Sequence, residues 1–240
     1  MSTLILVRHG QASFGSSNYD QLSELGISQS AALGEYWVKR AQKLDAVFSG
    51  AQERQKHTLA IVQEAYARAG LAFPRPQVLG AFNEYDAMGI MSNVYPRLLQ
   101  EDPRLQKIVK ETPNLGDASS EGRRAFQRAF EIVIDCWLEG AVDMPEVESW
   151  KHFRERVVQG MEKMKSDFPS GKTVAIFTSG GAISTAVGHD LGMSDRKAMG
   201  LQWVIRNASL TEFMFGGQRS TMTGFNLTPH FANDSLITYR

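Results

Sequence analysis

The chain has 240 residues, which is enough to bury a substantial hydrophobic core in one large domain or two small ones. Its 26 Lys and Arg residues balance 26 Asp and Glu residues, so no overall positive field favours a nucleic acid or an anionic membrane as a partner. A site for an anion must therefore be formed by local charges.

The single cysteine, Cys136, has no disulfide partner within the chain, which is typical of a protein in a reducing compartment. The apolar run before Arg8 is too short for the core of a signal peptide. No stretch reaches the roughly 18 apolar residues that a membrane span needs. The sequence therefore predicts a soluble cytoplasmic protein without a membrane partner.

Short aliphatic and β-branched runs alternate with longer segments of helical period, which predicts an α/β fold. We expect three α/β/α layers around a mostly parallel sheet, with strands at 3–7, 45–49 and 173–177. The first two strands are followed by helices whose apolar stripes are Leu33, Trp37 and Ala41 in one and Leu59, Val62 and Tyr66 in the other. Gly180 and Gly181 open the helix after the third strand.

The C-terminal part contains two β-rich segments on either side of Gly216-Gly217, which predicts an antiparallel hairpin at one edge of the sheet. Between about residues 83 and 148 the pattern changes to proline-interrupted helical segments. One of these has a stripe formed by Phe126, Phe130, Val133 and Trp137. We predict one domain, 1–240, that carries this segment as an inserted helical cap, because no repeat or linker marks a boundary.

The first predicted strand ends at Arg8-His9-Gly10. In open α/β sheets, ligands bind beyond the carboxyl ends of the strands. Arg8 offers a planar fork suited to phosphate or carboxylate, and neutral His9 has a ring nitrogen that can attack phosphorus or accept a proton. Gly10 removes a side chain where the backbone must turn. The tripeptide is also frequent by chance, so other strand ends must support it.

Two further strand ends give that support. Arg54, in SGAQERQKHTLA, falls on the first turn of the helix after the second strand. The segment TSGGAIS places Ser179 and Gly180 at a helix start, where hydroxyls and backbone N–H groups are suited to an oxyanion. Both features suit a phosphate-like ligand.

Together these blocks resemble the histidine phosphatase superfamily, the phosphoglycerate-mutase-like proteins. The matching blocks are LILVRHGQAS, LSELGISQS, SGAQERQKHTLA, FNEYD and VAIFTSGGAIS, in this order between residues 4 and 184. The resemblance implies that His9 is a nucleophile that forms phosphohistidine and that Arg8 and Arg54 hold the phosphoryl oxygens. It also implies that Glu84 protonates the leaving oxygen. A transferring phosphoryl group spreads charge over its equatorial oxygens, so its catalysis depends on positioning and cationic donors.

The proposed acid needs a raised pKa, which a closed pocket beside an anionic phosphate would give the Glu84 carboxyl. Asp86 or Glu53 could supply the proton instead, and Glu84 could be a solvated loop carboxylate. Arg54 has a similar alternative as an exposed helix charge. We favour Glu84 because it occupies the family position.

One departure from the family pattern concerns Ser179, because members usually carry a second histidine there. A hydroxyl is a neutral donor where an imidazolium is charged, a difference of about 1 to 2 kcal/mol, and loss of an oxyanion donor costs roughly 100-fold to 1,000-fold in rate. We expect Ser179 and Gly180 to bind phosphate with slow turnover, and Ser179→His to raise the rate if the missing cation is limiting. Each of the four other histidines is an alternative for the missing ring, although a surface or packing role is the simpler interpretation of each. These histidines are His57, His152, His189 and His230.

A second departure is Gly15, where many members have asparagine; Ser13, Ser16 or Asn18 could take that polar role. The helical segment also offers arginines that could grip a second acidic group of a substrate. These are Arg97, Arg104, Arg123, Arg124 and Arg128.

Two classes of function remain. The first is a phosphomonoesterase that acts on a small phosphorylated substrate through His9, with mutase activity as a variant that needs room for two acidic groups. No cofactor is implied, because no histidines or carboxylates stand at metal-ligand spacing. The second is a non-catalytic module that binds a phospho-ligand or a protein. Retention of the nucleophile and the acid favours the enzyme, while the oligomeric state and the natural substrate stay open.

Overall fold

The computed structural model describes residues 1–13, 20–112, 119–140, 147–217 and 219–239. The chain forms two compact units, Met1–Glu84 with Arg156–Arg240 and, separately, Tyr85–Glu155. Within the described ranges, no helix combines the length and the hydropathy that crossing a bilayer requires. The two units are described in turn.

The first unit is built on a six-stranded sheet with the order β3-β2-β4-β1-β5-β6. Its strands are β1 (Ser2–Arg8), β2 (Ala46–Ser49), β3 (Gln77–Val78), β4 (Thr173–Thr178), β5 (Leu210–Gly216) and β6 (Arg219–Leu227). The first four strands are parallel, β5 runs antiparallel to β1, and β6 pairs antiparallel with β5 at the edge. The structure thus confirms the mostly parallel α/β sheet and the hairpin at its edge.

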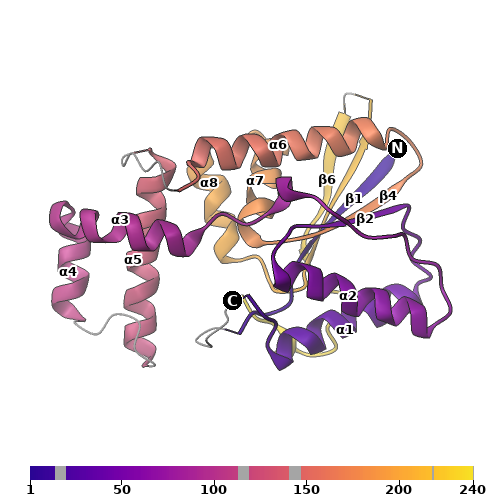
Figure 1. Ribbon diagram of the computed structural model, residues 1–240, viewed down its shortest axis with the longest axis horizontal. Helices are drawn as coiled ribbons and strands as arrows, with labels where there is room; N and C mark the ends of the chain where they lie inside the picture. Colours follow the sequence, from indigo (N-terminus) through magenta and orange to yellow (C-terminus); the bar gives the residue numbers. More distant parts are fainter. Residues whose placement is uncertain (14–19, 113–118, 141–146, 218, 240) are drawn as a thin grey trace. The chain divides into compact units, whose positions relative to one another are not determined.

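Helices cover both faces of this sheet (Figure 1). α1 (Glu24–Lys39) and α2 (Glu53–Arg68) lie on one face, and α7 (Gly180–Asp190) lies on the other with the part of α6 (Trp150–Asp167) that belongs to this unit. Shorter elements complete the unit: α8 (Asp195–Gly200) and the 3-10 helices η1 (Gly80–Phe82), η2 (Leu201–Trp203) and η3 (Asp234–Leu236).

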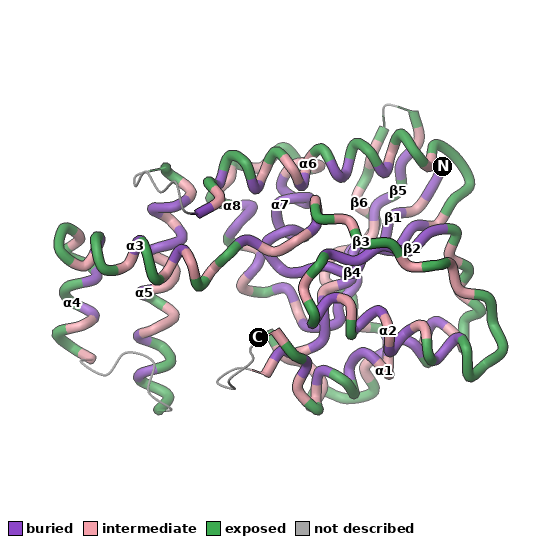
Figure 2. The backbone as a smooth tube through the Cα atoms, in the orientation of Figure 1, coloured by how far each residue is buried: buried purple, intermediate pink, exposed green. Residues whose placement is uncertain are grey.

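The main core lies between α1, α2 and the sheet. Trp37 packs edge-on against Phe177 of β4, with ring centroids 6.1 Å apart. The central strands are buried on both faces (Figure 2), which explains why their sequences are continuous aliphatic runs without alternation. The predicted stripe of α1 is confirmed for Leu33 and Trp37, but it is wrong for Ala41. That residue lies beyond the end of α1, is exposed, and has a φ of 49°.

The second unit is helical and contains α3 (Ala87–Glu101), α4 (Pro103–Glu111), α5 (Ser120–Leu138) and the first residues of α6. Its aromatic cluster centres on Trp137, whose ring centroid lies 5.0 Å from that of Tyr85, 5.5 Å from Trp150 and 5.9 Å from Phe153. The indole N–H of Trp137 donates to the carbonyl of Glu148 at 2.9 Å. This cluster gives the unit a core of its own.

Candidate active site

The candidate site lies in the first unit, where β1, β4 and β2 end side by side. The backbone N–H of His9 donates to Thr178 O at 2.9 Å, and that of Gly50 donates to Phe177 O at 3.0 Å. A Cβ on Gly10 would lie 2.4 Å from the carbonyl oxygen of Gly26. Gly10 therefore allows α1 to approach the end of β1 closely. This is a second reason for a glycine here, in addition to the backbone turn that the sequence predicted.

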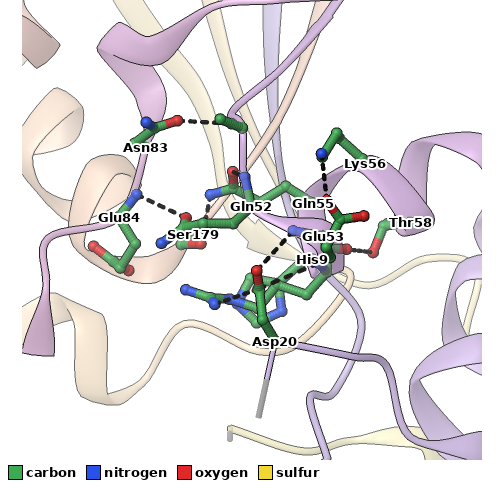
Figure 3. A network of polar contacts seen from close by, with 12 residues as sticks. His9, Asp20, Gln52, Glu53, Gln55, Lys56, Thr58, Asn83, Glu84 and Ser179 are labelled. Carbon is green, nitrogen blue, oxygen red and sulfur yellow. Dashed lines mark hydrogen bonds and ion pairs between the residues drawn. The ribbon is translucent and has the colours of Figure 1, made fainter. Parts of the chain in front are cut away.

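The His9 ring is held from both sides (Figure 3). Its Nδ1 lies 2.6 Å from Gly10 O, and Nε of Arg54 lies 3.2 Å from its Nε2. A carbonyl oxygen can only accept and a guanidinium can only donate, so Nδ1 carries the proton and Nε2 keeps its lone pair. The arrangement selects the neutral tautomer in which Nδ1 is protonated and Nε2 carries the lone pair.

The electrostatic surroundings of His9 agree with this assignment. Burial lowers the pKa of His9 well below its usual range, and the positive charges of Arg54 and Arg8 lower it further. The hydrogen bond to the backbone of Gly10 opposes the shift without cancelling it. The imidazole is therefore neutral at neutral pH.

Arg54 is positioned by a carboxylate that sequence reasoning missed. Asp20 Oδ1 accepts from Arg54 Nη1 at 2.7 Å, and Asp20 Oδ2 accepts from the backbone N–H of Glu53 at 2.9 Å. Arg54 lies on the first turn of α2, as predicted, and is buried there beside His9. One nitrogen of the Arg54 guanidinium contacts Asp20 and another contacts His9, so the guanidinium is fixed next to the His9 ring.

Arg8, the last residue of β1, directs its guanidinium toward the C-terminal part of the unit. Its Nη1 donates to the carbonyls of Ile205 and Tyr239, the latter at 2.8 Å. A Cβ on Gly180 would lie 3.8 Å from Arg8 Cζ, so the guanidinium is also close to the start of α7. The two arginines therefore place positive charge on the site from different elements.

Glu84 reaches the N-terminus of α7. Its Oε2 accepts from the backbone N–H of Gly181 at 2.9 Å, and its own N–H donates to Gln52 Oε1 at 3.0 Å. A helix start attracts anions, and here a carboxylate occupies one of its donors. Of the alternative acids, Asp86 instead caps α3 by accepting from Gly89 N at 2.8 Å, and Glu53 is exposed and paired with Lys56.

Two residues of α2 that the sequence did not single out complete the network in Figure 3. Thr58 Oγ1 accepts from the N–H of Gly10 at 3.0 Å and donates to Arg54 O at 2.8 Å. Gln55 Nε2 donates to Ser179 Oγ at 2.8 Å. Residues 54, 55 and 58 share one face of the first turns of α2, a spacing that could have marked them once Arg54 was chosen.

Three of the other candidate histidines belong to the first unit and take no part in the network described above, while His152 and the candidate arginines of the helical segment belong to the second unit. His57 is exposed on α2, His189 faces Glu162 at 3.3 Å, and His230 packs against Phe231. Among the proposed arginines, Arg104 pairs with Asp102 at 2.6 Å within the second unit. The described residues contain no group of three His, Cys, Asp or Glu side chains placed to hold a metal ion. Gly15, Ser16 and Asn18 lie outside the described residues.

The sheet order and its flanking helices define a phosphoglycerate-mutase-like α/β fold. The structure of Bacillus stearothermophilus YhfR matches it with a TM-score of 0.65 at 16% identity, covering 96% of this chain and 99% of that one. The mycobacterial glucosyl-3-phosphoglycerate phosphatase Rv2419c matches with a TM-score of 0.59 at 18% identity, covering 94% and 99%. At these identities the likeness establishes the fold alone.

The sequence itself matches the model of the histidine phosphatase superfamily (branch 1) over residues 4–106 and 98–228. The chain therefore belongs to the histidine phosphatase superfamily. It is also similar to the 2,3-bisphosphoglycerate-dependent phosphoglycerate mutase of Rhizobium etli (strain CIAT 652), with 33% identity over 98 residues. That match covers 37% of this chain and 44% of the relative, so it spans less than half of either protein.

Proposed function

We propose that the protein is a metal-independent phosphatase that hydrolyses a small phosphomonoester through a phosphohistidine at His9. The observation that carries this proposal is the state of the His9 ring. Nδ1 faces Gly10 O at 2.6 Å, while Nε2 faces a cationic group, Arg54, at 3.2 Å. A module that only bound phosphate would need neither a selected tautomer nor a depressed pKa at this histidine.

In the first step, the lone pair of His9 Nε2 attacks phosphorus and the ester P–O bond breaks. The leaving oxygen takes a proton from the Glu84 carboxyl and departs as an alcohol. Arg54 and Arg8 stabilise the charge on the equatorial oxygens of the phosphoryl group, together with the N–H groups at the start of α7.

In the second step, water attacks the phosphorus of phosphohistidine and gives a proton to the Glu84 carboxylate. The P–N bond breaks, its electron pair returns to Nε2, and inorganic phosphate leaves. Glu84 is again protonated, so the cycle closes. The contact between Glu84 Oε2 and Gly181 N, at 2.9 Å, supports the location of the carboxyl group beside the start of α7; protonation of Glu84 requires that an anionic phosphate, bound there, displaces the carboxylate from this donor.

The test compares hydrolysis of p-nitrophenyl phosphate, in the presence of a chelator, by the wild type and by His9→Ala. His57→Ala is a matched control, because it removes an exposed histidine only three positions beyond Arg54. We expect His9→Ala to abolish turnover and His57→Ala to leave it unchanged. Turnover that survives in His9→Ala, or that requires a divalent metal, contradicts the proposal.

A second candidate is a phosphoglycerate-mutase-type phosphotransferase, which the similarity to the Rhizobium etli mutase favours. In that reaction the phosphoryl group returns from His9 to a hydroxyl of the bound intermediate instead of passing to water. Incubation with 3-phosphoglycerate and catalytic 2,3-bisphosphoglycerate distinguishes the two. Formation of 2-phosphoglycerate faster than release of inorganic phosphate identifies the mutase.

A further inference from the structure

A buried polar pair joins α2 to the start of α7. Gln55 Nε2 donates to Ser179 Oγ at 2.8 Å, and both residues have no exposed surface. The oxygen of the same side-chain amide also has a partner, because Gln55 Oε1 accepts from the backbone N–H of Gln52 at 3.3 Å. Since a backbone N–H can only donate, the oxygen must face Gln52 and the NH₂ group must face Ser179.

The glycine at position 50 makes room for this amide. A Cβ there would lie 2.0 Å from Gln55 Oε1 and 2.8 Å from its Cδ. Gly50 follows β2 directly, so the end of that strand is shaped around the Gln55 side chain. The orientation of the amide is therefore set by backbone on one side and by Ser179 on the other.

The direction of this hydrogen bond determines where the Ser179 proton points. A hydroxyl has one proton, and its oxygen already accepts from Gln55. Ser179 is the N-cap of α7, yet its side chain makes no capping hydrogen bond to the helix. Within the part of the chain that the structure describes, the Ser179 hydroxyl donates to no acceptor, which is unusual for a fully buried group.

We propose that Gln55 is a positioning residue that turns the Ser179 hydroxyl so that it donates to a phosphoryl oxygen bound at the start of α7. The inference rests on the proposed function and adds a residue to it. The pair supplies a neutral, oriented donor at the position where the family pattern has a charged imidazole. Gln55 acts only through Ser179, so the two residues must depend on each other.

The experiment is a double-mutant cycle with Ser179→Ala, Gln55→Met and the double variant. Methionine matches glutamine in length and adapts to a packed site but has no N–H donor. We expect each single variant to lower kcat for p-nitrophenyl phosphate about tenfold, with a smaller change in KM, and the double variant to be no worse than Ser179→Ala. Unchanged kcat in both single variants, or losses that multiply in the double variant, overturn the inference.

A second variant isolates the donor. Gln55→Glu keeps an oxygen for the Gln52 N–H but replaces the NH₂ group by an acceptor, so the Ser179 proton turns toward position 55. We expect a loss in kcat at least as large as in Gln55→Met. A Gln55→Glu protein with wild-type kcat contradicts the inference even where Gln55→Met fails to fold.

A control variant on the same helix distinguishes a positioning role of Gln55 from a purely structural one. Tyr66→Phe removes the hydrogen bond from Tyr66 Oη to Gln42 O at 2.8 Å, in the last turn of α2, whereas Gln55 lies in the first turn. We expect it to lower the melting temperature without changing kcat. If the Gln55 variants behave in the same way, lower in stability but unchanged in kcat, the residue is structural and the inference is wrong.

Binding of inorganic phosphate, measured by calorimetry, separates this inference from the proposed function. If His9→Ala still hydrolyses p-nitrophenyl phosphate, the proposed function fails. The inference about Gln55 and Ser179 is then tested by phosphate binding alone. Weaker binding of phosphate in each single variant, by a factor smaller than the fall in kcat and with no further loss in the double variant, supports the pair. Equal dissociation constants in all four proteins overturn it.

Discussion

Nε of Arg54 lies 3.2 Å from Nε2 of His9, so the guanidinium donates to the same lone pair that the proposed reaction uses. Asp20 Oδ1 binds another nitrogen of the same guanidinium, Nη1, at 2.7 Å. The ring is thus oriented and kept neutral before any phosphate arrives. In the proposed reaction, a bound phosphoryl group takes over the donor, since its oxygens are stronger acceptors for a guanidinium than an imidazole nitrogen is.

Arg54→Gln is expected to raise the pKa of His9, because the positive charge of Arg54 is one of the causes that lower it. Burial remains, so the pKa stays below that of an exposed histidine. The same variant should lower kcat/KM by roughly 100-fold to 1,000-fold, because a charged donor to the phosphoryl group is lost. An NMR titration of the His9 ring measures the first effect and steady-state kinetics the second.

The matched control is Arg68→Gln, which removes an exposed arginine from the last turn of the same helix. It should leave both measurements unchanged. A His9 pKa that does not move in Arg54→Gln would show that Arg54 does not act on the ring.

Glu84→Gln is expected to distinguish substrates by their leaving groups. Glutamine cannot protonate a departing alkoxide, so the rate for an alkyl phosphate should fall by about 100-fold to 10,000-fold. Nitrophenolate leaves without help, so the first step with p-nitrophenyl phosphate, measured as the first-turnover release of nitrophenolate, should slow much less. Comparing the two substrates in one assay measures this difference.

Asp86→Asn provides the comparison, because Asp86 was the alternative acid and caps α3 in the structure. It should slow both substrates equally or not at all. A leaving-group effect in Asp86→Asn but not in Glu84→Gln would transfer the acid role to Asp86.

The structure revises the expectation that Ser179→His alone raises the rate. Ser179 is fully buried and Gln55 Nε2 lies 2.8 Å from its oxygen, so an imidazole at position 179 would have to displace the Gln55 amide. Overpacking of this kind costs about 1 to 3 kcal/mol. We expect Ser179→His to lose stability and activity, and Gln55→Ala with Ser179→His to recover activity above either single variant. Thermal unfolding and kcat measured on all three proteins test this, and a single Ser179→His variant that is stable and faster than the wild type refutes it.

Stability should fall on acidification partly because of His230. Burial lowers its pKa to about 4, so between about pH 6.5 and pH 4 the unfolded chain binds a proton that the folded chain does not. Folding stability is therefore lost as the pH falls through this window, by about 3 kcal/mol at its lower end. The ring packs between Tyr36 and Phe231, so His230→Phe keeps an aromatic group there.

Denaturant unfolding of the wild type and of His230→Phe between pH 8 and pH 4 measures this contribution. The variant should lose less stability over the acidic range. Its curve will not become flat, because the lowered pKa of His9 adds a loss of the same sign. Parallel curves for the two proteins would mean that His230 is not neutral and buried in the folded state.

The strands β1, β2 and β4, the edge hairpin and most of the buried stripes could be predicted from the sequence, because aliphatic runs and helical periods report burial directly. The strand β3 could not, because its two residues are exposed and form no such run. The end of α1 could not, since Ala41 fits the period of the stripe while the chain has already left the helix with a positive φ. The positions of His9, Arg54 and Ser179 followed from strand ends. Asp20 did not, because its contact with Arg54 joins polar residues whose sequence separation carries no periodic signal. Gln55 and Thr58 could have been found only from their helical spacing to Arg54.

The most direct test of the central claim is detection of phosphate on His9 itself. Rapid mixing with ³²P-labelled p-nitrophenyl phosphate, whose leaving group needs no acid, followed by alkaline quench and mass spectrometry of peptides, identifies an acid-labile phosphoramidate and its position. The proposed reaction predicts labelled His9 in the wild type, greater accumulation where dephosphorylation is slowed in Glu84→Gln, and no label in His9→Ala. Label on another residue, or turnover of the wild type with His9 never labelled, would contradict it.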